Sequence, residues 1–202
     1  SSDYSKLNTK RLRFILSNTD SKIIYASSVG VYGDLSELPH HPLGPVNPLN
    51  SYAHSKLDCE KLVLQAGGIV ARLSNIYGQG MSKKNIISDV LKQITTKDVD
   101  AINIINGTPI RDMIHVSDVT SCLLAMTTIP KKGVYNVASG INVSMKDLAM
   151  IILEAAQLGG CNLVESNKSK ATSCISLDIS KTKEVFDWSP CIRLKDGLKE
   201  LI

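Results

Sequence analysis

Residues 51–73, with the sequence SYAHSKLDCEKLVLQAGGIVARL, decide the fold class because they join a helix to a short apolar strand. Apolar side chains recur at helical spacing across 51–65, and Gly67 and Gly68 end the helix. The run 69–73 is apolar except for one arginine and is predicted to form a buried strand. A helix that leads directly into a buried strand is typical of α/β proteins.

The same alternation continues on both sides of this unit. Helices are predicted near 5–17, 85–94, 117–127 and 144–156, strands at 22–27, 102–105 and 134–138, and an amphipathic piece at 194–202. The stretch 34–50 carries four prolines, which exclude a regular element and predict a long surface loop. Strands that alternate with helices indicate βαβ units and hence a parallel sheet.

The composition is that of an ordinary globular protein. The 202 residues carry a net charge of +4, from 23 basic and 19 acidic side chains scattered along the chain, which argues against nucleic-acid binding. Five cysteines without a CxxC pair predict neither a metal site nor a disulfide framework, and they indicate a reduced, cytoplasmic protein. No apolar stretch approaches the roughly 20 residues that span a bilayer, so no membrane segment is predicted.

Tyr52 and Lys56 stand four positions apart at the start of the 51–65 helix, so their polar ends can meet on one face. An ammonium group close to a phenol favours the phenolate, which makes Tyr52 a candidate acid/base. The alternative is an ordinary surface pair, since this spacing also arises by chance.

Two hydroxyls, Ser27 and Ser28, stand at the end of the apolar strand that precedes the proline-rich loop. The carboxyl end of a parallel strand is where ligands bind in open α/β sheets, which favours a functional role. The alternative for Ser28 is a turn or helix-cap hydroxyl.

Four other side chains are given structural roles. His40 and His41 are predicted as surface residues of the loop, because neither has partners at metal-ligand spacing. His115 lies in an apolar run and is predicted as a partly buried structural histidine, and Trp188 as a packing anchor.

Six segments, in this order along the chain, resemble one known family. They are SSVGVYGD at 27–34, NPLNSYAHSKLDCEKL at 47–62, ARLSNIYGQG at 71–80, TPIRDMIHVSDV at 108–119, GVYNVASG at 133–140 and LDISKTKEVFDWSP at 177–190. Together they are similar to the extended short-chain dehydrogenase/reductases, also called the NAD-dependent epimerase/dehydratase family. The resemblance implies an NAD(P)-dependent enzyme that acts on a nucleotide-linked sugar.

The resemblance assigns catalytic roles to Ser28, Tyr52 and Lys56. It implies that Tyr52 removes a proton from a sugar hydroxyl as hydride leaves that carbon for the nicotinamide, or runs the reverse. Ser28 is expected to hydrogen-bond the same oxygen, and Lys56 to bind the nicotinamide ribose and tune Tyr52. The cofactor, NAD or NADP, is expected to contact Ser27 and Asn8 as well as Tyr52 and Lys56.

The resemblance also implies that Asn75, Asn85 and Arg111 bind a nucleotide-diphosphate sugar. A guanidinium suits a diphosphate because it presents paired donors. The residues themselves leave two alternatives open: an ion pair of Arg111 with Asp112 or Asp118, and a plain N-cap role for Asn85.

Two departures from the family pattern change the expected chemistry. Where sugar dehydratases of the family carry an Asp-Glu pair and its decarboxylases keep an acid, this chain has Val29 and Gly30, which move no proton. Epimerisation at the sugar's fourth carbon, or reduction and oxidation of a keto sugar, therefore remain. Lys168 and Lys170 stand where an arginine is common, so the phosphate contacts are expected to be weaker or rearranged.

A third departure concerns the cofactor. No GxxGxxG turn occurs in the sequence, so the first βαβ units of the family fold are expected to be missing by truncation. The predicted fold is α/β: the C-terminal part of a Rossmann-like doubly wound parallel sheet plus a small α+β substrate-binding lobe. Residues 1–80 are predicted as the partial Rossmann-like domain and 81–202 as mainly the lobe, with 102–138 returning to the main sheet.

The predicted function is that of a nucleotide-sugar epimerase that moves a hydride between a sugar carbon and NAD(P), and this fragment is expected to be inactive alone. One alternative is a nucleotide-linked 4-keto-sugar reductase. Another, of a different class, is a non-catalytic nucleotide-sugar-binding or assembly module. The resemblance further implies a homodimer formed through a four-helix bundle by the helices near 5–17 and 51–65.

Overall fold

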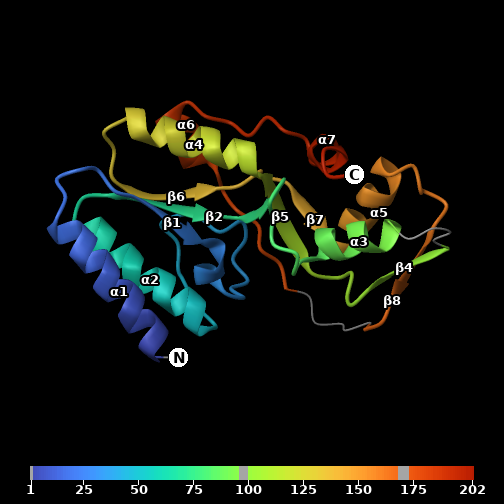
Figure 1. The fold of residues 1–202 in the computed structure, drawn as a ribbon. Coiled ribbons are helices and arrows are strands. Elements are labelled where there is room, and N and C mark those ends of the chain that lie inside the picture. The colour runs from blue at the N-terminus through green and yellow to red at the C-terminus, as the bar shows by residue number, and fades with distance from the viewer. Residues whose placement is uncertain (1, 96–99, 168–172) are drawn as a thin grey trace.

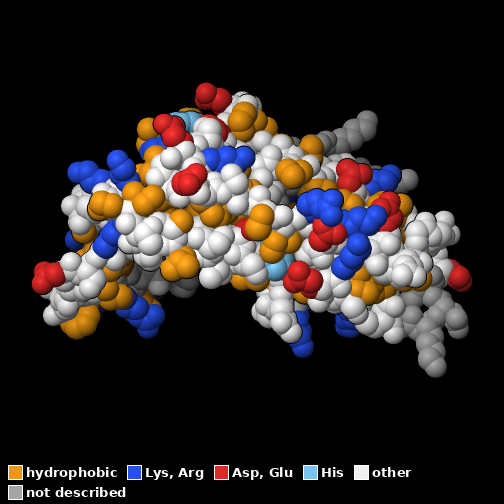
Figure 2. All heavy atoms as spheres, turned by 90° about the horizontal axis from the view of Figure 1, so that it is seen from above, with side chains coloured by type: hydrophobic (Ala, Val, Ile, Leu, Met, Phe, Trp, Pro, Cys, Tyr) orange, Lys and Arg blue, Asp and Glu red, His pale blue; other side chains and the backbone are white. Residues whose placement is uncertain are grey.

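The computed structural model describes residues 2–95, 100–167 and 173–202, with side chains from Ser5 onward. Lys168 and Lys170 lie outside the described residues. None of the described helices is both long and apolar enough to cross a lipid bilayer. On the face that carries α4 and α6, basic and acidic side chains are interspersed and apolar side chains are scattered (Figure 2).

The main sheet has three parallel strands, in agreement with the predicted α/β class. In spatial order they are β1 (Ile24–Ser28), β2 (Ile69–Leu73) and β6 (Gly133–Val137). The central strand β2 is buried along most of its length, as is usual for a parallel sheet covered on both faces. The register places Ser28 beside Leu73 and Leu73 beside Val137, so the three strands end at a common edge.

Helices cover both faces of this sheet (Figure 1). One face carries α1 (Ser2–Ser17) and α2 (Ser51–Gln65), and the other carries α4 (Val116–Thr128) and α6 (Ser180–Phe186). Alternate residues of β2 serve the two faces, since successive strand side chains point in opposite directions. Val70 packs in a cluster with Val63, whereas Ile69 and Ala71 pack in a cluster with Trp188, which is the predicted packing anchor.

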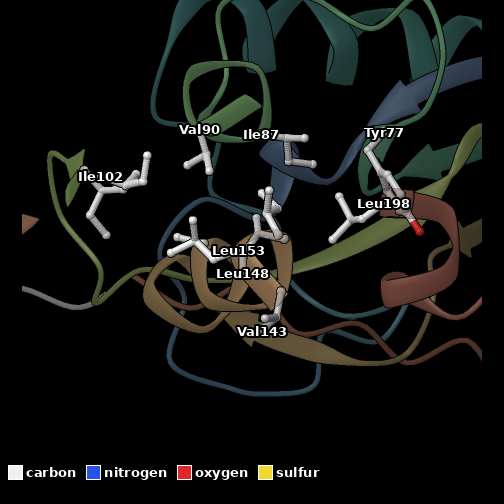
Figure 3. Close-up of a cluster of buried hydrophobic side chains, with 11 residues drawn as sticks. Tyr77, Ile87, Val90, Ile102, Val143, Leu148, Leu153 and Leu198 are labelled. Carbon is white, nitrogen blue, oxygen red and sulfur yellow. The ribbon is translucent and has the colours of Figure 1, made fainter. Parts of the chain in front are cut away.

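A second group of elements forms a smaller lobe beside the main sheet (Figure 1). Its strands are β3 (Asn75–Tyr77), β5 (Ile110–His115) and β7 (Asn142–Ser144) in one sheet, and β4 (Ala101–Ile104) with β8 (Asn162–Glu165) in another. Its helices are α3 (Ile86–Ile94), α5 (Met145–Ala155) and α7 (Leu194–Lys199). Figure 3 shows their shared core, in which Ile87 and Val90 of α3 meet Leu148 and Leu153 of α5 and Leu198 of α7.

The strands of this lobe differ in part from the expected organisation. Within 102–138, β6 joins the main sheet, but β4 pairs only with β8 among the described strands. Strand β5 is absent from the sequence prediction, because Arg111 and Asp112 interrupt its apolar run. The division of the chain at residue 80 stays a prediction.

The segment after β1 starts with a short 3-10 helix, η1 (Val29–Tyr32), and then forms the proline-rich loop. The backbone of His40 fastens this loop to the C-terminal part of the chain: its N–H donates to the Ser176 carbonyl at 2.8 Å, and its carbonyl accepts from the Asp178 N–H at 3.1 Å. The His40 ring stacks on Tyr32 at 4.6 Å between ring centres and is 4% exposed. The prediction of His40 as a surface residue is therefore wrong, whereas His41 is exposed as predicted.

Candidate active site

A cavity of about 530 Å³ opens at the carboxyl ends of β1 and β2, between the main sheet and the smaller lobe. The residues expected to act there and found in its wall are Ser27, Ser28, Tyr52, Lys56, Asn75, Asn85 and Arg111. They come from β1, α2, β3, the start of α3 and β5, which are far apart in the sequence. The fold therefore gathers seven of the eight expected site residues around one space.

Ser28 is the last residue of β1, and its side chain faces this cavity. Its Oγ atom accepts a hydrogen bond from the Gly30 N–H at 3.1 Å and so caps η1. The cap role foreseen as an alternative is thus present. It does not exclude a ligand role, because the capping bond uses the oxygen as acceptor and leaves the hydroxyl hydrogen for another oxygen.

Tyr52 and Lys56 project from the first two turns of α2. The helix begins after Asn50, whose Oδ1 accepts from the Ala53 N–H at 2.9 Å and so fixes where the first turn starts. Tyr52 is 46% exposed, which leaves its phenol accessible from the cavity.

The ammonium group of Lys56 is held on three sides. Its Nζ atom donates to the Ala26 carbonyl at 2.7 Å, and it lies 4.9 Å from the centre of the Tyr25 ring and 5.7 Å from the centre of the Tyr52 ring. The bond to Ala26 uses one of the three ammonium hydrogens, so two remain for a ligand. Burial raises the pKa of Tyr25 well above its usual range, and Cys59 raises it further, so that ring stays neutral beside Lys56.

Asn8 lies outside the first cavity. Its Nδ2 atom donates to Ser55 Oγ at 3.0 Å, and it lines a neighbouring cavity of about 480 Å³ that Tyr52 and Lys56 also border. The structure thus brings Asn8 close to the Tyr-Lys pair but on the α1 side of it.

Arg111 enters the cavity from β5 and is fixed by the segment after residue 172. Its guanidinium donates to the Ser173 carbonyl at 2.9 Å and to Ser173 Oγ at 2.8 Å. Burial lowers its pKa, and no described residue forms an ion pair with it. The alternative of an ion pair with Asp112 or Asp118 is therefore wrong.

Those two acids bind other groups. Asp112 accepts from the N–H groups of Ser139 and Gly140 at 2.8 and 2.7 Å, and Asp118 accepts from the N–H groups of Cys191 and Ile192, both at 3.1 Å. Since their carboxylates hold backbone donors, neither acid is available to Arg111.

The two asparagines are also held in place. Asn75 donates from Nδ2 to the Asp112 carbonyl at 3.1 Å, while Asn85 Oδ1 accepts from the Ser88 N–H at 2.9 Å and caps α3. The N-cap alternative for Asn85 is thus observed. The positive end of the α3 dipole consequently faces the same cavity as Arg111.

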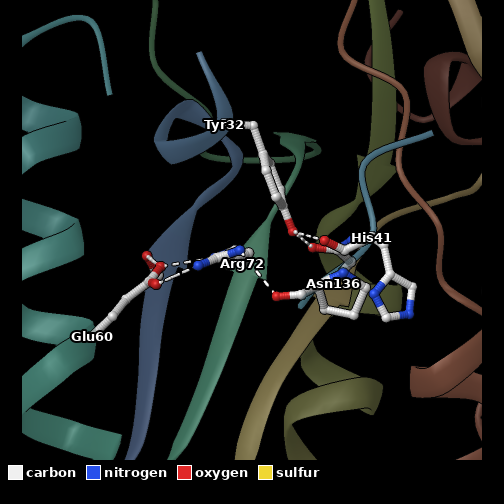
Figure 4. Close-up of polar contacts among 7 residues, drawn as sticks. Tyr32, His41, Glu60, Arg72 and Asn136 are labelled. Carbon is white, nitrogen blue, oxygen red and sulfur yellow. Dashed lines mark hydrogen bonds and ion pairs between the residues drawn. The ribbon is translucent and has the colours of Figure 1, made fainter. Parts of the chain in front are cut away.

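A buried polar cluster next to the cavity is absent from the sequence prediction (Figure 4). Arg72 of β2 forms an ion pair with Glu60 of α2, 2.7 Å between Nη2 and Oε2, and both side chains are almost fully buried. In the sequence, the sign of this buried pair is a single arginine inside the apolar run 69–73. Nothing in that run identifies the partner, because the partner comes from another element.

His115 is buried as expected and lies against Tyr77, at 5.2 Å between ring centres. Its Nδ1 accepts from the Ser117 N–H at 3.3 Å, and its Nε2 lies 3.5 Å from a Glu200 carboxylate oxygen. Across the described residues, no cluster of three or more His, Cys, Asp or Glu side chains has the arrangement of a metal site.

This arrangement supports chemistry by proton transfer. A phenol, an ammonium group and a hydroxyl line the cavity at the end of parallel strands, and the smaller lobe adds a guanidinium and two amides to the same cavity. Residues 7–138 match the family model described as the NAD dependent epimerase/dehydratase family, and the chain belongs to this family.

Its relatives are sugar-nucleotide enzymes. The chain is 32% identical over 191 residues to a putative UDP-glucose 4-epimerase of Methanocaldococcus jannaschii, covering 90% of this chain and 62% of the relative. It is 32% identical over 194 residues to a GDP-6-deoxy-D-mannose reductase of Pseudomonas aeruginosa, covering 89% of this chain and 64% of the relative. The chain thus spans just over three fifths of the length of these curated relatives.

Solved structures agree with this assignment. The RMD protein of Pseudomonas aeruginosa, solved with NADPH, superposes with a TM-score of 0.88 at 26% identity, over 96% of this chain and 71% of that one. A UDP-glucose 4-epimerase of Thermotoga maritima, solved with UDP-glucose, has the same fold, with a TM-score of 0.79 at 21% identity, over 94% of this chain and 64% of that one.

Proposed function

We propose that this chain carries the proton-transfer and sugar-binding half of an NAD(P)-dependent enzyme that oxidises or reduces a carbon of a nucleotide-linked sugar. The observation that carries the proposal is the meeting of Ser28, Tyr52 and Lys56 in one cavity with Asn75 and Arg111. Since the chain spans only part of its relatives' length, the activity is proposed for the whole protein.

In the proposed reaction, the Tyr52 phenol moves a proton to or from the oxygen of the reacting carbon. Ser28 donates a hydrogen bond to the same oxygen, and the Lys56 ammonium stabilises the phenolate form of Tyr52. Nicotinamide, when bound, supplies or accepts the hydride. The residues fit such a cofactor, because Tyr52 is accessible and Lys56 has two ammonium hydrogens left for ribose hydroxyls.

The substrate proposal rests on the residues that the smaller lobe contributes to the cavity. The donors suited to a diphosphate are the amide groups of Asn75 and Asn85 and the guanidinium of Arg111. This guanidinium forms no ion pair with any of the described residues. A further cavity of about 510 Å³ shares Asn85, Ile86 and Met145 with the first and can accept the nucleoside. The two volumes together suit an elongated ligand.

Epimerisation is the first candidate, and it is supported by the similarity to the Methanocaldococcus relative. Reduction of a 4-keto sugar is the second, and it is supported by the similarity to the GDP-6-deoxy-D-mannose reductase of Pseudomonas aeruginosa. Dehydration and decarboxylation are disfavoured, because Val29 and Gly30 carry no acid/base group next to Ser28. The third possibility is a binding or assembly module without turnover.

A homodimer and a cytoplasmic location belong to this proposal. The outer side of α1 exposes Leu7, Phe14 and Ile15 at 45%, 71% and 50%, which would be covered if α1 and α2 packed against a second copy. Sedimentation velocity tests this: a dimer is expected, and a monomer at all concentrations would refute it.

The activity is tested on the whole protein, since this chain is expected to be inactive alone, by incubation with NAD or NADP, oxidised and reduced, and a panel of UDP-, GDP- and dTDP-linked sugars. An epimerase gives a new sugar without net change in NADH absorbance, whereas a reductase consumes NAD(P)H with a 4-keto sugar. Calorimetry with the same ligands measures binding separately. Sugar-nucleotide binding without turnover would support the binding module, and absence of both would refute the substrate assignment.

A further inference from the structure

The Glu60–Arg72 pair is an ion pair that is almost fully withdrawn from solvent. The two residues are 1% and 4% exposed, and Arg72 donates to both carboxylate oxygens of Glu60, from Nε at 3.1 and 3.3 Å and from Nη2 at 2.7 Å. Burying two charges costs about as much free energy as their attraction returns, so such a pair is a weak source of net stability. What the pair does provide is a set of directional hydrogen bonds between α2 and β2.

Glu60 connects the two elements that carry the proposed catalytic trio. On α2 it lies one turn after Lys56 and two turns after Tyr52. Its Oε1 atom also accepts a hydrogen bond at 2.5 Å from the hydroxyl of Ser27, the residue directly before Ser28. One carboxylate thus ties the helix of Tyr52 and Lys56 to the strand of Ser28.

Arg72 supplies the second connection, to the segment that follows Ser28. Its guanidinium lies 4.8 Å from the centre of the Tyr32 ring and donates to the Pro42 carbonyl at 3.2 Å. Tyr32 in turn donates to Asn136 Oδ1 at 2.6 Å (Figure 4). The chain on both sides of Ser28 is therefore fastened to the same ion pair.

We propose that Glu60 and Arg72 are positioning residues, which hold α2 against β1 at the separation that lets Tyr52 and Ser28 reach one substrate oxygen. Neither is among the side chains that line the 530 Å³ cavity, so they act through Ser27, Lys56 and the α2 backbone. The inference rests on the proposed function and names two further residues of the same site. Small displacements of reacting groups lower rates strongly, which makes such a link consequential.

The test uses Glu60→Gln and Ser27→Ala in the whole protein, with Glu154→Gln as the matched control. Glu154 pairs with Lys195 at 2.9 Å on an exposed surface of the smaller lobe. In the turnover assay we expect Glu60→Gln to lower kcat about tenfold or more and Ser27→Ala to lower it about threefold, with KM within about threefold of the wild type. The control is expected to keep both constants.

A second readout needs no turnover. In chain labelled with 3-fluorotyrosine, the fluorine resonance of Tyr52, assigned by its loss in Tyr52→Phe, is expected to move in Glu60→Gln and Ser27→Ala. The resonance of Tyr77 in the smaller lobe is expected to stay in place. A role in stability alone would lower the melting temperature and leave the Tyr52 resonance unmoved.

The outcomes separate this inference from the proposed function. Wild-type kcat in either folded variant overturns the positioning role, and so does an unmoved Tyr52 resonance in both. If Glu60→Gln does not fold, Ser27→Ala decides the question. That variant removes one hydrogen bond to Glu60 but leaves the buried Glu60–Arg72 charges paired. If the wild type lacks turnover, the proposed activity fails, and the fluorine spectra alone decide on positioning.

Discussion

The ammonium nitrogen of Lys56 lies 5.7 Å from the centre of the Tyr52 ring, one helical turn further along α2. The hydrogen bond to the Ala26 carbonyl at 2.7 Å holds it there, between the helix and the end of β1. This hydrogen bond connects Tyr52 and Lys56, which are neighbours on α2, to β1, which lies about 30 residues earlier in the chain.

Tyr52→Phe is expected to lower turnover by about 10²- to 10⁴-fold, because the ring remains and only the proton-transferring hydroxyl is lost. Affinity for the nucleotide sugar is expected to stay within about threefold, since the hydroxyl acts mainly in the transition state. Initial rates and calorimetry measure the two effects. Tyr135→Phe is the control, because its hydroxyl bonds only the Lys132 carbonyl at 3.2 Å among the described residues. A wild-type rate in Tyr52→Phe would remove this phenol from the mechanism.

Arg111→Met is expected to weaken binding of UDP or GDP about tenfold or more, equivalent to roughly 1.4 kcal/mol, because a charge-assisted contact to the diphosphate is lost. Calorimetry measures the change, and circular dichroism checks that loss of the Ser173 contacts leaves the fold intact. Arg193→Met provides the control, since that side chain is 85% exposed and pairs with Asp196. Equal affinities in Arg111→Met and the wild type would contradict the assignment.

His40→Phe is expected to reduce the loss of stability on mild acidification. Burial lowers the pKa of His40, with Glu37 opposing the effect, so the folded state favours the neutral ring. Its stabilising contribution is therefore present above the unfolded pKa of about 6.5 and is lost as the pH falls below that value. Phenylalanine keeps the stack on Tyr32 but does not titrate.

Urea unfolding at several values between about pH 7.5 and 5.5 measures this slope. The wild type is expected to lose stability over the range, and His40→Phe to lose less. His41→Phe, at the exposed neighbouring position, is expected to keep the wild-type slope. The same slope in all three proteins would show that His40 is not the titrating group.

Gly33→Ala is expected to destabilise the fold by about 1–3 kcal/mol or more. Its φ of +68° disfavours a side chain, and an added Cβ would lie 2.0 Å from the Asn47 carbonyl oxygen. Gly67→Ala is the matched control, with a φ of +75° but no atom within 4 Å of the added Cβ. Chemical denaturation of both variants separates steric overlap from backbone strain. Equal losses would mean that the Asn47 contact adds nothing.

Much of the local structure follows from the sequence alone. The apolar spacing across 51–65 and the glycines after it predict α2, and the short run 69–73 predicts β2, because these signals act over one or two turns. The Tyr52–Lys56 spacing and the position of Ser28 at a strand end identify candidate chemistry for the same reason. The six segments that resemble the family follow one another along the chain in the family's order, which predicts the order of the helices and strands.

Other features depend on residues brought together from distant parts of the chain. Glu60 and Arg72 are 12 residues apart, His40 binds the backbone near residue 176, and Arg111 donates to Ser173 across 62 residues. Periodicity within a window carries no information about such partners. The sequence therefore predicts His40 as a surface residue, and it leaves open an ion pair of Arg111 as an alternative that the fold does not supply. The sequence determined the helices except α6, the strands of the main sheet and which side chains are candidates for catalysis. Tertiary packing decided which of them share a cavity, because only burial against another element selects the partner of each polar group.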